Sequence, residues 1–134
     1  FRTADGVVAD KIFLCGITPA PPHRKIEKVS LGAEKTMPWE KRRQIWRIIE
    51  KLKKEGFFIL ALENKIKCAE NIFDFSKCQN KTALIIGNEV GGISPAIIRR
   101  CDKIVYIPMR GKKESLNVAV AFGIAAYQIC DKIK

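Results

Sequence analysis

Three short apolar runs constrain the fold of this chain more than any other feature. Phe57–Leu62 and Thr82–Ile86 lack the alternation of apolar and polar residues, and Lys103–Ile107 adds another run of strand length. Unbroken apolar runs are typical of strands buried on both faces, as in a parallel sheet. Helical patterns separate these runs, so we expect an α/β fold with a mainly parallel sheet and helices on both faces.

Two longer segments carry helical patterns. In Glu40–Glu55 the apolar residues recur at the spacing of one helix face, and Gly56 ends the pattern. A closing helix over roughly Ser115–Lys132 is apolar on nearly every side, which predicts burial on more than one side. We also expect a strand at Lys11–Cys15 and a short helix that opens at Ser94.

Length and charge narrow the class of protein. A chain of 134 residues fits one domain, so we expect residues 1–134 to form a single domain. The net charge of +11 favours a polyanion such as RNA or DNA, because neutralising phosphates releases counterions. No apolar run approaches the roughly 20 residues of a membrane-spanning helix, so no membrane partner is expected. The uncapped start Phe1–Asp5 predicts that the domain is truncated at its N-terminus.

The cysteine and histidine pattern argues against a metal site. The five cysteines show no C-x-x-C spacing, and the single histidine, His23, has no neighbouring cysteine. We therefore expect no metal, and reduced thiols in a cytoplasmic protein. The cysteines are Cys15, Cys68, Cys78, Cys101 and Cys130.

Three loops with small or polar residues follow predicted strands. They are Ala61–Asn64, Gly87–Ser94 and Pro108–Ser115. Ligands in parallel sheets collect beyond the carboxyl ends of the strands, so we expect these loops to line one pocket. The glycines of the middle loop match neither the G-x-G-x-x-G nor the P-loop spacing, so a nucleotide site of those kinds is weakly supported. In the last loop we expect Ser115 to cap the closing helix and to aim its N-terminus at a polar or anionic ligand.

These loops also resemble known motifs. Gly87-Asn88-Glu89 with Gly92-Ile93-Ser94, followed by Ile107-Pro108-Met109 and Ser115-Leu116-Asn117-Val118, resembles the second and third motifs of SPOUT-class RNA methyltransferases, in the TrmH-type (SpoU-type) branch. Phe1–Asp5 resembles the end of the first motif, whose earlier residues would lie upstream. The resemblance runs through nearly the whole chain.

The resemblance implies a fold, a cofactor and a reaction. It implies one SPOUT domain with a C-terminal trefoil knot that binds S-adenosylmethionine and forms a homodimer. The implied reaction transfers a methyl group to a ribose 2′-hydroxyl of tRNA or rRNA. A non-catalytic RNA-binding member of the same fold is the alternative, and a small-molecule nucleotide-binding enzyme is a third hypothesis that the glycine spacing disfavours.

The resemblance also implies roles for residues. Arg2 matches the catalytic arginine, and Glu89 would hold Arg2 or position the substrate. Ser115 and Asn117 would order the active-site loop and the substrate. Cofactor contacts, mostly from the main chain, are expected from Ala61, Leu62, Glu63, Gly87, Asn88, Ile107, Met109, Leu116 and Asn117.

Cations near the third motif are expected to contact RNA. Arg110, Lys112 and Lys113 lie in the site loop and are the candidates for phosphate contacts. The basic face of Glu40–Glu55, and Arg99, Arg100 and Lys103 after the second motif, offer a further surface for RNA. Most charged helix faces are only solvated, and we expect this for the face of Glu40–Glu55. Without the start of the first motif, Arg2 is expected to be poorly positioned, so that such a chain binds cofactor but methylates poorly.

Overall fold

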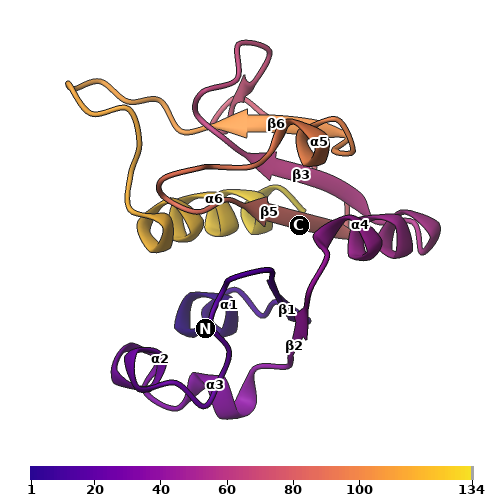
Figure 1. The fold of residues 1–134 in the computed structure, drawn as a ribbon. Coiled ribbons are helices and arrows are strands. Elements are labelled where there is room, and N and C mark those ends of the chain that lie inside the picture. The colour runs from indigo at the N-terminus through magenta and orange to yellow at the C-terminus, as the bar shows by residue number, and fades with distance from the viewer. Residues whose placement is uncertain (134) are drawn as a thin grey trace. The chain divides into compact units, whose positions relative to one another are not determined.

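The computed structural model describes residues 1–133 and contains two compact units, Phe1–Ile45 and Trp46–Lys134 (Figure 1). The first unit pairs two parallel strands, with Ile12 opposite Trp39 and Cys15 opposite Arg42. Its elements are α1 (Arg2–Gly6), β1 (Ile12–Cys15), α2 (Arg24–Ser30), α3 (Ala33–Thr36) and β2 (Trp39–Arg42).

The strand β2 corrects one prediction. The helix expected over Glu40–Glu55 begins only at Ile45, because residues 40–42 are extended and hydrogen-bond to β1. The apolar helical spacing itself starts at Ile45, so the preceding charged residues gain nothing from a helix and gain a strand partner instead. Arg42 then pairs with Glu40 at 2.7 Å on the strand surface.

The second unit is built on a parallel four-stranded sheet of order β4-β6-β3-β5. The strand pairs of this sheet are parallel and helices accompany them, so the α/β prediction with a mainly parallel sheet is confirmed. The strands are β3 (Phe58–Leu62), β4 (Glu70–Asn71), β5 (Thr82–Ile86) and β6 (Lys103–Tyr106). The helices are α4 (Ile45–Lys54), α5 (Pro95–Ile98) and α6 (Val118–Ile133).

The central strand β3 shows why the apolar runs do not alternate. Ile59, Leu60 and Ala61 are all fully buried, although successive side chains of a strand point to opposite faces. On one face Leu60 belongs to a cluster with Val105 of β6 and Ile129 of α6. Both faces of this strand are therefore withdrawn from water, as expected for a parallel sheet.

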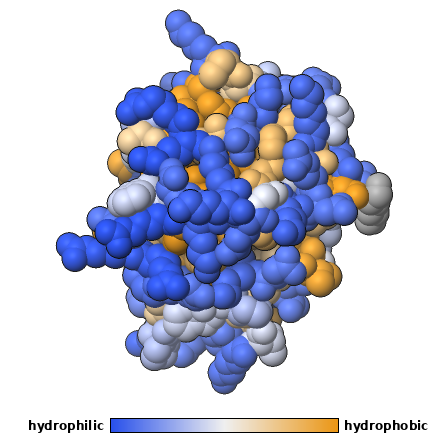
Figure 2. All heavy atoms as spheres, turned by 90° about the vertical axis from the view of Figure 1, so that its right-hand side faces the viewer, coloured by the Kyte–Doolittle hydropathy of each residue, from blue (hydrophilic) through white to orange (hydrophobic). Residues whose placement is uncertain are grey.

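Helix α4 has one buried and one charged face. Ile48 and Ile49 are buried, while the basic residues of the helix are exposed. Gly56 ends the helix with a φ of +84°, and the Phe57 amide bonds the Leu52 carbonyl at 2.9 Å, as in a Schellman motif. Hydrophilic side chains cover most of the face shown in Figure 2, the side on which α4 lies in Figure 1.

Helix α6 starts later than predicted. It begins at Val118, and its cap is Asn117, whose Oδ1 accepts a hydrogen bond from the Ala119 amide at 2.9 Å. The predicted cap at Ser115 is wrong. The physical reason is that Leu116 packs against the core cluster of the second unit from the irregular segment, so the helix can start only after it.

Candidate functional site

A cavity of about 300 Å³ lies in the second unit, beyond the carboxyl ends of β3, β5 and β6. All three predicted loops contribute to its wall, which confirms that they meet at one pocket. The lining consists of residues 62–66 and 86–93 with Pro95, Ile107, Ser115, Leu116, Val118 and Ala121.

The middle loop is shaped by backbone proximity. A Cβ on Gly87 would lie 2.3 Å from the Gly92 carbonyl carbon, so no larger residue fits there. Gly92 has a φ of +62°, and a Cβ there would lie 2.4 Å from the Glu63 carboxylate. Asn88 closes the turn, because its Oδ1 accepts hydrogen bonds from the Val90 amide at 3.0 Å and the Gly91 amide at 2.5 Å. These contacts fix a tight turn, and at its glycines a ligand can approach the main chain closely.

Glu63 ties the first loop to the middle loop. Its carboxylate accepts hydrogen bonds from the Ile93 amide at 3.0 Å and from the Lys65 amide at 3.3 Å. Charge-assisted bonds of this kind are stronger than neutral ones. Glu63 therefore stabilises the pocket wall by joining these two loops.

Asn64 ties the first loop to the third. Its amide nitrogen donates to the Ile107 carbonyl at 2.9 Å, and its oxygen accepts from the Ile107 amide at 3.2 Å. The same nitrogen lies 3.3 Å from the Glu114 carbonyl. The Asn64 side chain thus pairs with both main-chain groups of Ile107, as a neighbouring strand would at the end of β6. Sequence reasoning missed this role, for which the only signal was a polar residue two positions after a buried strand.

Two candidate catalytic residues meet across the pocket mouth. The Asn117 side chain donates a hydrogen bond to Glu89 Oε1 at 3.2 Å, which links the middle loop to the start of α6. Glu89 and Ser115 both line the pocket and are exposed. The site therefore combines an exposed carboxylate, a hydroxyl and an amide beside an apolar cavity.

Residues 1–127 match the family model described as the SpoU rRNA Methylase family. The chain belongs to this family. The resemblance to the TrmH-type (SpoU-type) branch of the SPOUT RNA methyltransferases is thereby confirmed.

Curated relatives support the assignment. The chain is 33% identical over 123 residues to the 23S rRNA (guanosine-2′-O-)-methyltransferase RlmB of Coxiella burnetii, covering 92% of this chain and 46% of the relative. It is 29% identical to the putative TrmH family tRNA/rRNA methyltransferase YacO of Bacillus subtilis, covering 98% of this chain and 51% of that relative. This SpoU-family chain thus spans about half the length of the curated relatives it matches.

Solved structures agree in fold. The A. aeolicus TrmH/SpoU tRNA modifying enzyme matches with a TM-score of 0.85 at 30% identity, over 98% of this chain and 65% of that one. The SpoU methyltransferase AviRb from Streptomyces viridochromogenes, in complex with AdoMet, matches with a TM-score of 0.86 at 26% identity. The match covers 98% of this chain and 53% of that one. The SPOUT-type α/β fold is therefore the fold of this SpoU-family chain.

The expected cofactor residues divide into two groups. Six of them line the pocket, namely Leu62, Glu63, Gly87, Asn88, Ile107 and Leu116. Three do not: Ala61 is fully buried in the core, and Met109 and Asn117 lie outside the lining. Pocket residues that the sequence did not single out for the cofactor include Asn64, Ile86 and Ala121.

The remaining predicted residues of this SpoU-family chain lie outside the pocket. Arg2 is an exposed residue of α1 in the first unit. Arg110, Lys112 and Lys113 are exposed in the loop between β6 and α6, which extends away from the sheet in Figure 1. In that loop only Glu114 has an ion pair among the described residues, with Lys65 at 3.6 Å.

The described residues offer neither a cluster of metal ligands nor a membrane-spanning helix. Across residues 1–133, no group of three or more His, Cys, Asp or Glu side chains is arranged to hold a metal ion. None of the helices in the same residues is both long and apolar enough to span a bilayer. The five cysteines form no disulfide within the described part of the chain.

Proposed function

We propose that this protein transfers a methyl group from S-adenosylmethionine to a ribose 2′-hydroxyl of tRNA or rRNA. The observation that carries the proposal is the pocket whose walls are the second and third motifs, joined by the hydrogen bond between Asn117 and Glu89. Two relatives add support, since one is named as a guanosine-2′-O-methyltransferase and another was solved with AdoMet.

The residues of the pocket fit this cofactor. Its volume of about 300 Å³ lies at the lower end of the range for small-molecule sites, roughly 300–1,000 Å³. Leu62, Ile107 and Leu116 offer apolar surface for an adenine ring, and the Gly87 region offers unobstructed main-chain groups. The carboxylates of Glu63 and Glu89 suit the positive charge of a sulfonium. When bound, the cofactor supplies an activated methyl group.

The protein's task is then to position the hydroxyl and to handle its proton. We assign Arg2 to hold an RNA phosphate and to stabilise the negative charge that develops on the 2′-oxygen, because a guanidinium stays protonated. Glu89, fixed by Asn117, orients the substrate, and Ser115 offers a hydroxyl at the pocket wall. Alignment of this kind can supply several kcal/mol of the barrier reduction, on the order of 7–11 in favourable cases.

We further propose that the protein forms a single SPOUT domain with a C-terminal trefoil knot, that it assembles as a homodimer and that it is located in the cytoplasm. Helix α6 supports the homodimer, since its large hydrophobic side chains Val120 and Tyr127 are 52% and 58% exposed. Arg110, Lys112 and Lys113 are proposed to contact RNA phosphates.

Nucleoside mass spectrometry tests the proposed reaction. RNA from cells that lack the protein is predicted to lose one 2′-O-methylated nucleoside from tRNA or rRNA. Expression of the natural protein restores that nucleoside, and the Arg2→Ala variant does not. An unchanged set of ribose methylations would contradict the methyltransferase, and RNA binding without any loss would favour the non-catalytic RNA-binding member.

A further inference from the structure

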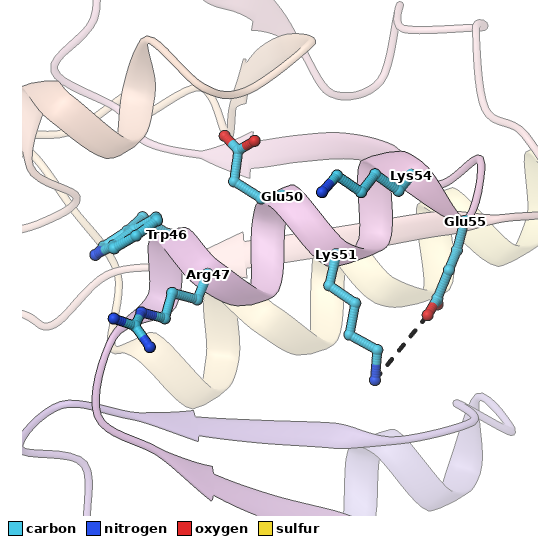
Figure 3. A pocket seen from close by; sticks show the side chains of 6 residues that line it. All are labelled: Trp46, Arg47, Glu50, Lys51, Lys54 and Glu55. Carbon is cyan, nitrogen blue, oxygen red and sulfur yellow. Dashed lines mark ion pairs between the residues drawn. The ribbon is translucent and has the colours of Figure 1, made fainter.

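A second surface of the protein combines an exposed indole with cations. It consists of Trp46, Arg47, Glu50, Lys51, Lys54 and Arg100, and we name it the Trp46 surface. All but Arg100 lie on α4, and Arg100 follows α5. The α4 members, with Glu55, line a hollow of about 530 Å³ (Figure 3).

The indole of Trp46 is held by two guanidinium groups. Arg47 Cζ lies 5.2 Å and Arg100 Cζ 5.6 Å from the ring centre, within the range of a cation–π interaction. The side chain of Arg100 is in turn fixed by Glu50 at 2.6 Å. Trp46 nevertheless remains 40% exposed. The ring is thus oriented in advance and accessible to a planar group.

The cations of this surface are only partly neutralised. Within residues 1–133, Arg47 and Lys54 form no ion pair, and Lys51 reaches Glu55 only at 4.0 Å between two exposed side chains. Such an exposed pair contributes little. In Figure 3, Arg47 and Lys51 point to the same side of α4 and Glu50 to the other. One side of the helix therefore presents positive charge next to the indole.

The shape of the hollow favours part of a polymer over a free small molecule. All its lining residues come from one helix and the residue after it, so no second element closes it. A small ligand is usually enclosed by 70–90% in its pocket, which a single helix cannot provide. Four cations against Glu50 and Glu55 also disfavour a second copy of the same surface, because like charges repel.

We propose that the Trp46 surface binds an unpaired nucleotide of RNA. The base stacks on the indole, and its phosphates contact Arg47 and Lys51, the combination by which proteins hold single-stranded RNA. Arg100 stays on the ring because Glu50 holds it, whereas Arg47 leaves the ring for a phosphate. The inference rests on the proposed function in one respect, namely that RNA is the substrate. It replaces the expectation that this helix face is only solvated, which leaves the exposed indole unexplained.

Fluorescence anisotropy with the whole chain tests the proposal. The probes are a labelled single-stranded RNA of about 12 nucleotides and the duplex formed with its complement. Trp46→Ala is expected to weaken single-strand binding by roughly tenfold, and Trp46→Phe to retain most of the affinity, because a phenyl ring still stacks. Neither change is expected to alter duplex binding. Arg47→Ala is expected to weaken binding and to reduce the salt slope by about 0.7, the value for one phosphate of a single strand.

The matched control is Lys77→Ala, which removes one exposed cation outside the Trp46 surface and is expected to leave the stacking contribution intact. Circular dichroism confirms the fold of each variant. Unchanged single-strand affinity in a folded Trp46→Ala variant overturns the proposal. The proposal is also overturned if Trp46→Ala changes the sedimentation coefficient but not the RNA affinity, because the surface would then join two copies of the chain. Titration with S-adenosylmethionine tests the proposed function separately, because a lack of cofactor binding contradicts that function alone. Weaker RNA binding by Trp46→Ala would still support the Trp46 surface.

Discussion

The side-chain amide of Asn117 donates a hydrogen bond to the Glu89 carboxylate at 3.2 Å, and the same side chain caps α6 through the Ala119 amide. One residue therefore sets both the start of the last helix and the orientation of a candidate catalytic carboxylate. Sequence reasoning assigned Asn117 to the site but gave the cap to Ser115. The two roles of Asn117 can be separated by substitution.

Asn117→Asp keeps an oxygen that can cap α6 but removes the donor to Glu89 and places two carboxylates together. We expect its melting temperature to stay close to that of the natural protein while restoration of the 2′-O-methyl mark is lost. Asn117→Ala removes the cap as well, which costs about 1 kcal/mol and lowers the melting temperature by roughly 3–5 °C. Calorimetric unfolding and nucleoside analysis measure the two effects. Equal activity of the Asp variant would show that the bond to Glu89 does not matter.

Asn64→Ala should destabilise the pocket wall. The change leaves the amide and carbonyl of Ile107 without their partners at 3.2 and 2.9 Å, at a site where Ile107 is only 5% exposed. Unpaired buried groups cost about 1–3 kcal/mol each, so the two groups together should lower the free energy of unfolding by about 2–6 kcal/mol. Asn80→Ala, at an exposed asparagine, is the control in denaturant titrations. Matching stabilities of the two variants would refute the role of Asn64.

Alanine substitutions at two neighbouring glycines of the middle loop should differ sharply in their effect on stability. Gly92→Ala places a Cβ 2.4 Å from the Glu63 carboxylate at a φ of +62°, so we expect it to distort the pocket and to lower stability. Gly91→Ala meets its nearest atom, Asn88 Oδ1, at 3.4 Å and is expected to be tolerated. Thermal unfolding of both variants measures the contrast. Similar melting temperatures would argue against the close approach of the two loops.

The thiols should differ in reactivity. Burial raises the pKa of Cys101 to about 11, and its thiol lies 3.2 Å from the Ile97 carbonyl, whereas Cys68 is exposed. The thiolate is the reactive form, so iodoacetamide at neutral pH should label Cys68 well before Cys101. Because the unfolded thiol loses its proton at lower pH than the folded one, the free energy of unfolding should fall as pH rises from about 9 to about 11. Peptide mass spectrometry reports the labelling, and rapid alkylation of Cys101 in the folded protein would be inconsistent with its burial.

The parallel sheet could be predicted because its strands are unbroken apolar runs, as Ile59, Leu60 and Ala61 illustrate. Strand β2 could not, because its residues Trp-Glu-Lys-Arg carry no apolar pattern and are extended only through their pairing with β1. The helix start at Val118 depends on where Leu116 reaches the core, which local capping preference does not encode.

The part of the site that could be predicted from the sequence is the set of loops that carry motifs. The three loops are contiguous segments that follow strands, so their meeting at one pocket follows from sheet topology. The ties made by Asn64 and Glu63 join residues about 30–43 positions apart, and no local pattern indicates such pairs. The aromatic and basic cluster at Trp46 depends in the same way on Arg100, which is far from it in sequence.

The central claim is that the pocket beyond β3, β5 and β6 binds S-adenosylmethionine. Isothermal titration calorimetry of the chain with this cofactor tests it most directly, with Gly87→Ala and Gly111→Ala as a matched pair. A Cβ at Gly87 would lie 2.3 Å from the Gly92 backbone, whereas one at Gly111 meets nothing within 4 Å. We predict saturable binding at one site per chain, lost in Gly87→Ala and kept in Gly111→Ala. Absence of binding by the natural chain, or equal binding by all three proteins, would contradict the account.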